Sequence, residues 1–131
     1  MALTYAQMED HEISNAKPIS AEEVLKALER DADAIVIDVR DTAEMEATGI
    51  NPRALSAPGR AVAWMADLES DYRSQELQDR SRRIFTTCGG SPSYRGAAAA
   101  NVLTSMGFLN VQFIDGGMAA MLAAGSSVKK P

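Results

Sequence analysis

The chain has 131 residues, of which 18 are acidic and 13 basic, and its formal net charge is −5 at neutral pH. This length provides one hydrophobic core and one domain, and the acidic balance argues against a nucleic-acid partner, which would require a basic surface. No apolar run approaches the ~20 residues that span a bilayer, so we expect no membrane association.

The number of cysteines limits which cellular compartment and which cysteine chemistry fit this chain. Cys88 is the only cysteine, so no intramolecular disulfide can form, and a lone thiol fits a reducing compartment. Residues 1–14 are polar and acidic, unlike a secretory signal, and we therefore expect a cytoplasmic protein. Without a Cys-x-x-Cys pair, neither a dithiol redox centre nor a zinc site of the usual kind is available, and we expect no metal.

The first third of the chain predicts an edge strand, a helix and a central strand. Residues 1–16 show no clear periodicity, and we expect a flexible or loosely docked arm there. Residues 17–19 suit an edge strand because they include proline. Ser20 and Glu23 have the spacing of a capping box, which predicts a helix to about Arg30. The nearly continuous apolar run in residues 34–40 is typical of a strand buried on both faces.

The remainder alternates between short helices and strands. Asp41 opens a helix that Gly49 ends, and residues 54–56 suit a brief strand. Helical spacing of apolar residues predicts a helix over residues 60–69, with Trp64 as a core anchor. The charged segment 69–83 is expected to be a solvated helix or loop. Residues 82–87 and 110–115 have the composition of strands. A helix is predicted to end at Gly107 and another to follow Gly116. Residues 126–131 are expected to form a frayed tail.

This alternation predicts a doubly wound α/β domain, with a parallel sheet covered by helices on both faces. In such sheets the ligand crevice lies at the carboxyl ends of the strands. Cys88 follows one predicted strand there. Asp38 and Arg40 end another, and their two-residue spacing places both side chains on one face. The pair can be a structural ion pair, a support for a site, or both.

Cys88 begins a loop of small residues between a strand and an alanine-rich helix. A thiol at this junction can lie close to loop N–H groups and to the positive end of the helix dipole. Both stabilise the nucleophilic thiolate. The alternative is a buried structural cysteine. The only histidine, His11, lies in the polar N-terminal segment, so we expect no imidazole base beside Cys88. The candidate substrate-binding residues are Gly89, Gly90, Ser91, Pro92, Ser93, Tyr94 and Arg95.

Two cysteine chemistries fit this loop. A cysteine phosphatase requires an arginine six positions after the nucleophile, where this chain has Tyr94. Arg95 comes one residue later, and in a helix this offset turns the side chain by about 100°. In sulfur transfer the loop holds a cysteine persulfide, which carries less charge than a phosphate. Amide groups and the hydroxyls of Ser91 and Ser93 can then suffice.

Several features, in order, resemble the rhodanese family of thiosulfate sulfurtransferases. Each is weak alone, but their combination and spacing are specific, and the resemblance covers residues 17–125. The matching features are Ile37–Asp41 followed by Glu44, Cys88 with its loop, Gly96–Ala98, Met106–Val111 and Asp115–Gly117. The resemblance implies a five-stranded parallel sheet in a domain at residues 17–125, between the arm and the tail.

The resemblance also implies a reaction. Cys88 would accept a sulfane sulfur from thiosulfate or another persulfide donor, and would pass it to cyanide, a thiol or a protein acceptor through a persulfide. Main-chain N–H groups from Gly89 through Tyr94 would stabilise that persulfide. Asp38 and Arg40 would order the loop from beneath, and no cofactor is implied.

The chain departs from the family pattern at four positions. Ser91 and Ser93 replace a common loop glycine and arginine, Gly49 replaces the usual histidine, and Met121 an aromatic residue. The missing arginine weakens anion binding and favours a thiol or protein persulfide over thiosulfate as the donor. Two other functions stay open: a non-catalytic binding or regulatory module with an unreactive cysteine, and a cysteine phosphatase or arsenate reductase-like enzyme.

Overall fold

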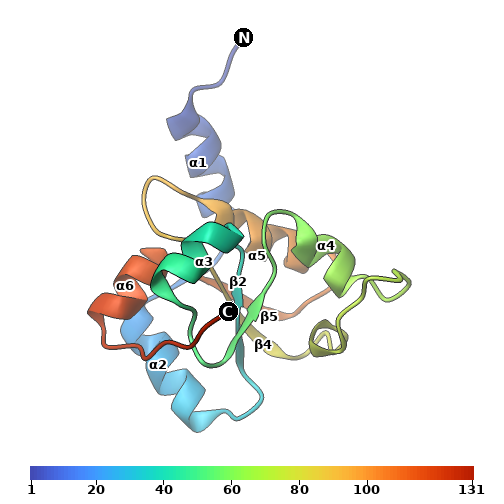
Figure 1. The fold of residues 1–131 in the computed structure, drawn as a ribbon. Coiled ribbons are helices and arrows are strands. Elements are labelled where there is room, and N and C mark those ends of the chain that lie inside the picture. The colour runs from blue at the N-terminus through green and yellow to red at the C-terminus, as the bar shows by residue number, and fades with distance from the viewer.

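A computed structural model describes residues 1–131, and its five strands form one parallel sheet in the order β1-β5-β4-β2-β3. The five-stranded, doubly wound α/β fold is therefore confirmed (Figure 1). The strands are β1 (Pro18–Ile19), β2 (Ile35–Asp38), β3 (Ala54–Ser56), β4 (Arg83–Thr87) and β5 (Asn110–Ile114). The helices are α1 (Tyr5–Ser14), α2 (Ala21–Arg30), α3 (Thr42–Thr48), α4 (Ala61–Ala66), α5 (Arg95–Ser105) and α6 (Gly117–Ala123), with a 3₁₀ turn, η1, at Gln75–Leu77.

Helices cover both faces of the sheet, and the side-chain alternation of β2 shows how. Ile35 and Ile37 pack in a cluster with residues of α4 and α5, whereas Val36 packs with residues of α2 and α6. All four β2 residues are buried. The continuous apolar run thus marks a strand covered from both sides, as in other parallel sheets.

Local capping explains where the helices around the site begin and end. The Ser20 hydroxyl accepts the Glu23 N–H, which starts α2. Asp41 caps α3, and Glu44 returns a bond by accepting the Asp41 N–H. Gly49 ends α3 with φ of +79°, a conformation that favours glycine. These boundaries confirm the predicted starts of both helices.

The N-terminal segment differs from the prediction, because residues 5–14 form the regular helix α1. Thr4 and Gln7 make a reciprocal capping box at its start. The helix lies against α5, where Asn101 donates a hydrogen bond of 2.7 Å to the Glu12 carboxylate. At the other terminus, Lys129 forms an antiparallel bridge with Ile50, so the expected frayed tail has fixed backbone contacts up to that residue.

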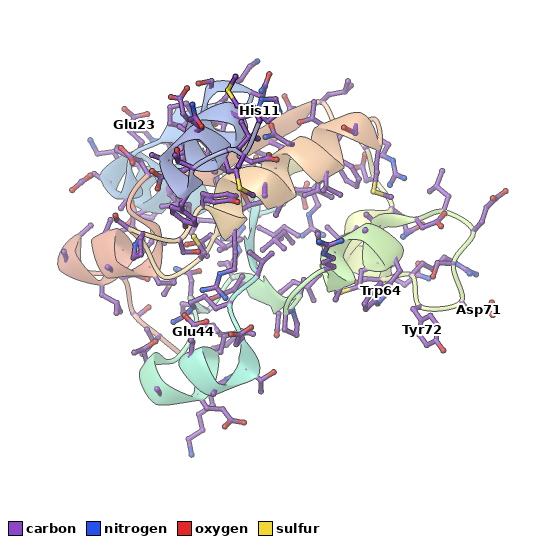
Figure 2. The ribbon with its side chains drawn as sticks, turned by 90° about the horizontal axis from the view of Figure 1, so that it is seen from above. His11, Glu23, Glu44, Trp64, Asp71 and Tyr72 are labelled. Carbon is purple, nitrogen blue, oxygen red and sulfur yellow. The ribbon has the colours of Figure 1, made fainter.

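Trp64 corrects a second prediction, because its side chain is not a core anchor. The residue is 49% exposed, and Figure 2 shows it beside the projecting loop that carries Tyr72. Helix α4 ends at Ala66, and its buried residues are alanines and Val62. The charged segment supplies the core residue instead, since Leu77 of η1 is fully buried. No helix of the structure has the length and apolar composition needed to cross a membrane.

Candidate active site

Cys88 lies at the carboxyl edge of the sheet, directly after β4, and is 6% exposed. Its Sγ atom is 3.6 Å from the carbonyl oxygen of Ser93, so the loop of residues 89–94 (the Cys88 loop) folds back over the thiol. The sulfur borders a small cavity of about 130 Å³, the inner cavity. Residues of α1, the loop, α5 and the β5–α6 turn line it, among them Glu9, Ile13, Cys88, Gly90, Ala97 and Asp115.

Two glycines let backbone approach Cys88 closely. A Cβ atom on Gly96 would lie 3.3 Å from the Cys88 nitrogen, so this residue lets the first turn of α5 pack against the end of β4. A Cβ atom on Gly117 would lie only 2.5 Å from the Cys88 carbonyl oxygen. That oxygen accepts the Met118 N–H at 2.7 Å, and the Gly89 oxygen accepts the Ala119 N–H at 3.1 Å. The start of α6 therefore holds the beginning of the loop.

The Cys88 loop carries N–H groups without acceptors inside the protein. The N–H groups of Gly89, Gly90, Ser91 and Tyr94 donate no backbone or side-chain hydrogen bond. The Ser93 N–H is already used, because it donates to the Gly90 carbonyl at 2.9 Å, and Pro92 has no N–H. Four of the five N–H groups in the loop are thus free to bind an anion or a persulfide.

Asp38 and Arg40 form a buried ion pair beneath the loop. Asp38 is fully buried and lies opposite Thr87 in the sheet register. The Arg40 guanidinium binds its carboxylate at 2.9 Å and also donates to the Thr48 hydroxyl and the Gly49 carbonyl. The Arg40 Cδ would lie 3.9 Å from a Cβ atom on Gly89. The predicted neighbourhood of this pair and the Cys88 loop is present in the structure; its supporting role stays a prediction.

Arg95, the first residue of α5, is held by acidic side chains of another element. Its Nη1 atom lies 2.9 Å from Glu44 Oε1, its Nη2 atom lies 3.1 Å from Glu44 Oε2, and Asp41 is 3.6 Å away. The Arg95 Nε–H donates to the Ser93 hydroxyl at 2.9 Å. The hydrogen bond from Arg95 lowers the pKa of Glu44, and the same bond raises the pKa of Arg95. Both side chains are therefore charged at neutral pH.

Tyr5 of α1 was not expected at the site. Its hydroxyl donates to the Pro92 carbonyl, and its ring lies 5.3 Å from the ring of Tyr94 between centroids. With Glu44, Arg95 and the loop, Tyr5 lines a wider surface pocket of about 660 Å³, the outer pocket. Burial and the charge of Glu9 raise the pKa of Tyr5. The Thr4–Gln7 spacing was the sequence signal for α1, but nothing in the sequence indicated that Tyr5 reaches the loop.

His11 is exposed on α1, as expected (Figure 2). The side chains of His, Cys, Asp and Glu form no group of three or more that could hold a metal ion. The polar side chains that line the inner cavity and the outer pocket are serines, tyrosines, acidic residues and one arginine.

Comparison with known proteins identifies the family of this fold and loop. A family model of the rhodanese-like domain matches residues 20–124. The chain belongs to the rhodanese-like family. No curated protein matches the sequence.

Solved structures resemble this rhodanese-like domain over nearly its whole length. A protein of unknown function from Rhodopseudomonas palustris, described as a possible tyrosine phosphatase, is 25% identical with a TM-score of 0.86, over 98% of this chain and 96% of that one. A rhodanese-like domain from Anabaena is 24% identical, with a TM-score of 0.70 over 87% and 79% of the two chains. The polysulfide-sulfur transferase of Wolinella succinogenes is 21% identical, with a TM-score of 0.73 over 93% and 84%. The last two similarities concern the fold alone.

Proposed function

We propose that this rhodanese-like domain is a sulfurtransferase that carries a sulfane sulfur on Cys88. The observation that supports this most strongly is the position of the thiol, which borders a small cavity under a loop with four free N–H groups. A persulfide adds one sulfur atom to Cys88. A cavity of about 130 Å³ has room for that atom, since a water molecule takes a share of ~30 Å³ in the liquid.

The proposed reaction has two displacement steps. The Cys88 thiolate attacks the outer sulfur of thiosulfate or of another persulfide; the donor's S–S bond breaks, and sulfite or a thiolate leaves with the bonding pair. The persulfide on Cys88 is then attacked at its outer sulfur by cyanide, a thiol or a protein thiolate, and the Cys88 thiolate leaves. N–H groups of the loop stabilise the negative charge on the persulfide between the steps. We propose that this occurs in a reducing compartment such as the cytoplasm, where the single thiol stays free.

The position of Arg95 favours sulfur transfer over phosphate ester hydrolysis. A phosphatase needs a cation that can clasp a dianion beside the nucleophile. Here the arginine side chain is directed to Glu44 and Asp41, and the inner cavity contains no Lys or Arg. Two acidic residues, Glu9 and Asp115, border it instead. A dianionic phosphate would meet unfavourable charge there.

The test is sulfur transfer from thiosulfate to cyanide, followed as thiocyanate, with Cys88→Ser as the matched inactive variant. A glutathione-derived persulfide serves as a second donor. The proposal predicts turnover with at least one donor, and its loss in Cys88→Ser. Hydrolysis of p-nitrophenyl phosphate without sulfur transfer would instead support a phosphatase. Inertness of Cys88 toward every donor would support a non-catalytic binding module.

A further inference from the structure

The two pockets that border the Cys88 loop are lined by one cationic side chain, and that cation is already bound to a carboxylate. Arg95 is the only Lys or Arg among the residues that line the inner cavity and the outer pocket. The acidic residues Glu9 and Asp115 line the inner cavity, and Glu44 lines the outer pocket. With Arg95 neutralised, the charge around the thiol is negative.

Glu44 is the residue that neutralises Arg95. Its two carboxylate oxygens bind the two terminal nitrogens of the guanidinium at 2.9 Å and 3.1 Å, a bidentate arrangement. The Glu44 side chain is also held in place at the start of α3, because its Oε1 atom accepts the Asp41 N–H at 3.1 Å. Figure 2 shows Glu44 on the side of α3 that faces the rest of the molecule. An oxyanion at the outer pocket would therefore compete with the Glu44 carboxylate for the same donors.

No second cation is free to take the place of Arg95. Arg40 lies behind Gly89, but its guanidinium is engaged by the buried Asp38 carboxylate, the Thr48 hydroxyl and the Gly49 carbonyl. Its side chain is almost completely buried. A ligand at Cys88 consequently finds backbone N–H groups and hydroxyls, and no unpaired positive charge.

We propose that Glu44 sets the charge selectivity of Cys88 by withholding Arg95 from small oxyanions. The inference rests on the proposed function in one respect: in sulfur transfer, Glu44 would make a neutral sulfur donor, or one whose charge is remote from the transferred sulfur, a better substrate than thiosulfate. Glu44 acts through Arg95 and is a specificity-determining residue, not a catalytic one.

The experiment compares alkylation of Cys88 by iodoacetate, an anion, with alkylation by iodoacetamide, its neutral analogue. In both reactions the thiolate displaces iodide, so the ratio of the two rate constants reports the charge near the sulfur and cancels its intrinsic reactivity. Glu44→Gln is expected to raise the iodoacetate-to-iodoacetamide ratio by about two- to fivefold, the range that one partly exposed charge pair supports. Glu46→Gln is the matched control, because Glu46 is exposed on the same helix and makes no ion pair.

A double-mutant cycle with Arg95→Gln separates release of the arginine from the simple loss of a negative charge. We expect the effect of Glu44→Gln to be smaller in the Arg95→Gln background, where only the loss of the negative charge remains. An equal effect in both backgrounds, or an effect no larger than that of Glu46→Gln, would overturn the inference. Circular dichroism and thermal unfolding of each variant verify that the fold is retained.

Binding of inorganic sulfate, followed through the amide resonances of the Cys88 loop, gives a readout that needs no reaction at the thiol. Glu44→Gln is expected to bind sulfate more tightly than the wild type by the same two- to fivefold factor; unchanged affinity counts against the inference. Neither measurement requires sulfur transfer. An intact charge effect without any persulfide would refute the proposed function alone, whereas turnover without the charge effect would refute this inference alone.

Discussion

Gly117→Ala tests whether close contact with α6 holds the Cys88 loop. The new Cβ atom would lie 2.5 Å from the Cys88 carbonyl oxygen and 2.7 Å from the Gly90 nitrogen, so backbone must move. Gly117 also has φ of +58°. The left-handed conformation costs an L-residue ~1–2 kcal/mol, and overpacking against a rigid neighbour costs ~1–3 kcal/mol. We therefore expect a loss of about 2–5 kcal/mol in unfolding free energy.

Gly59→Ala is the matched control for this substitution. Gly59 has nearly the same φ, +63°, but no atom lies within 4 Å of the position where its Cβ would be. It should lose only the conformational part, ~1–2 kcal/mol, and the effect of alanine on the unfolded chain is common to both variants. Any excess in Gly117→Ala therefore reports the contact with the loop.

The assay is equilibrium denaturation in urea, combined with the rate of Cys88 alkylation by iodoacetamide. Gly117→Ala should unfold at a lower urea concentration than Gly59→Ala and should alter the alkylation rate, because the hydrogen bonds from α6 to the Cys88 and Gly89 carbonyls depend on the same approach. Equal stabilities and equal alkylation rates for the two variants would refute the reasoning.

Three further predictions concern the ion pairs and the core. Arg40→Met leaves the Asp38 carboxylate buried without its partner and should lower the unfolding free energy in chemical denaturation by ~3–5 kcal/mol. A variant as stable as the wild type would show that the ion pair does not stabilise the fold. Leu77→Ala should lower the unfolding free energy by ~2–5 kcal/mol because the side chain is fully buried. Trp64→Ala, at a half-exposed position, should lower it by about 1 kcal/mol or less. A larger loss of melting temperature in Trp64→Ala than in Leu77→Ala would contradict the assigned burial. Because the hydrogen bond from its arginine partner lowers the pKa of Glu44 below its ordinary 4.5, ionised Glu44 stabilises the fold above that pH and the contribution is lost as the pH falls through the lowered pKa. Glu44→Gln should therefore show a smaller fall in melting temperature on acidification below pH 4.5, and identical acid profiles would contradict the pairing.

Much of the fold could be predicted because its signals are local. The apolar run around Val36 identified a strand covered on both faces, and Ser20 and Asp41 marked helix starts through side-chain caps. The position of Cys88 at the carboxyl edge of the sheet followed from the strand before it and the helix after it. Each inference needed only residues within about one element of the chain.

The parts of the site that escaped prediction depend on contacts distant in sequence. Glu44 could be recognised as a cap residue, but its pairing with Arg95 joins residues 51 positions apart. The Tyr5 hydroxyl meets the loop across 87 positions. Trp64 has the spacing of a core residue, yet helix α4 buries Val62 and Ala66 in the core and leaves Trp64 half exposed. Amphipathic spacing predicts which residues share a face, and packing of the other elements decides which face is buried.

The central claim is that Cys88 accepts a sulfur atom. It is tested most directly by the intact mass of the full chain after exposure to thiosulfate or a polysulfide under anaerobic conditions, with peptide mapping to locate the modification. The account predicts a gain of one sulfur on Cys88, removable by cyanide with release of thiocyanate, and no gain in Cys88→Ser. An unmodified wild-type protein after treatment with both donors, in a fold shown intact by circular dichroism, would contradict it.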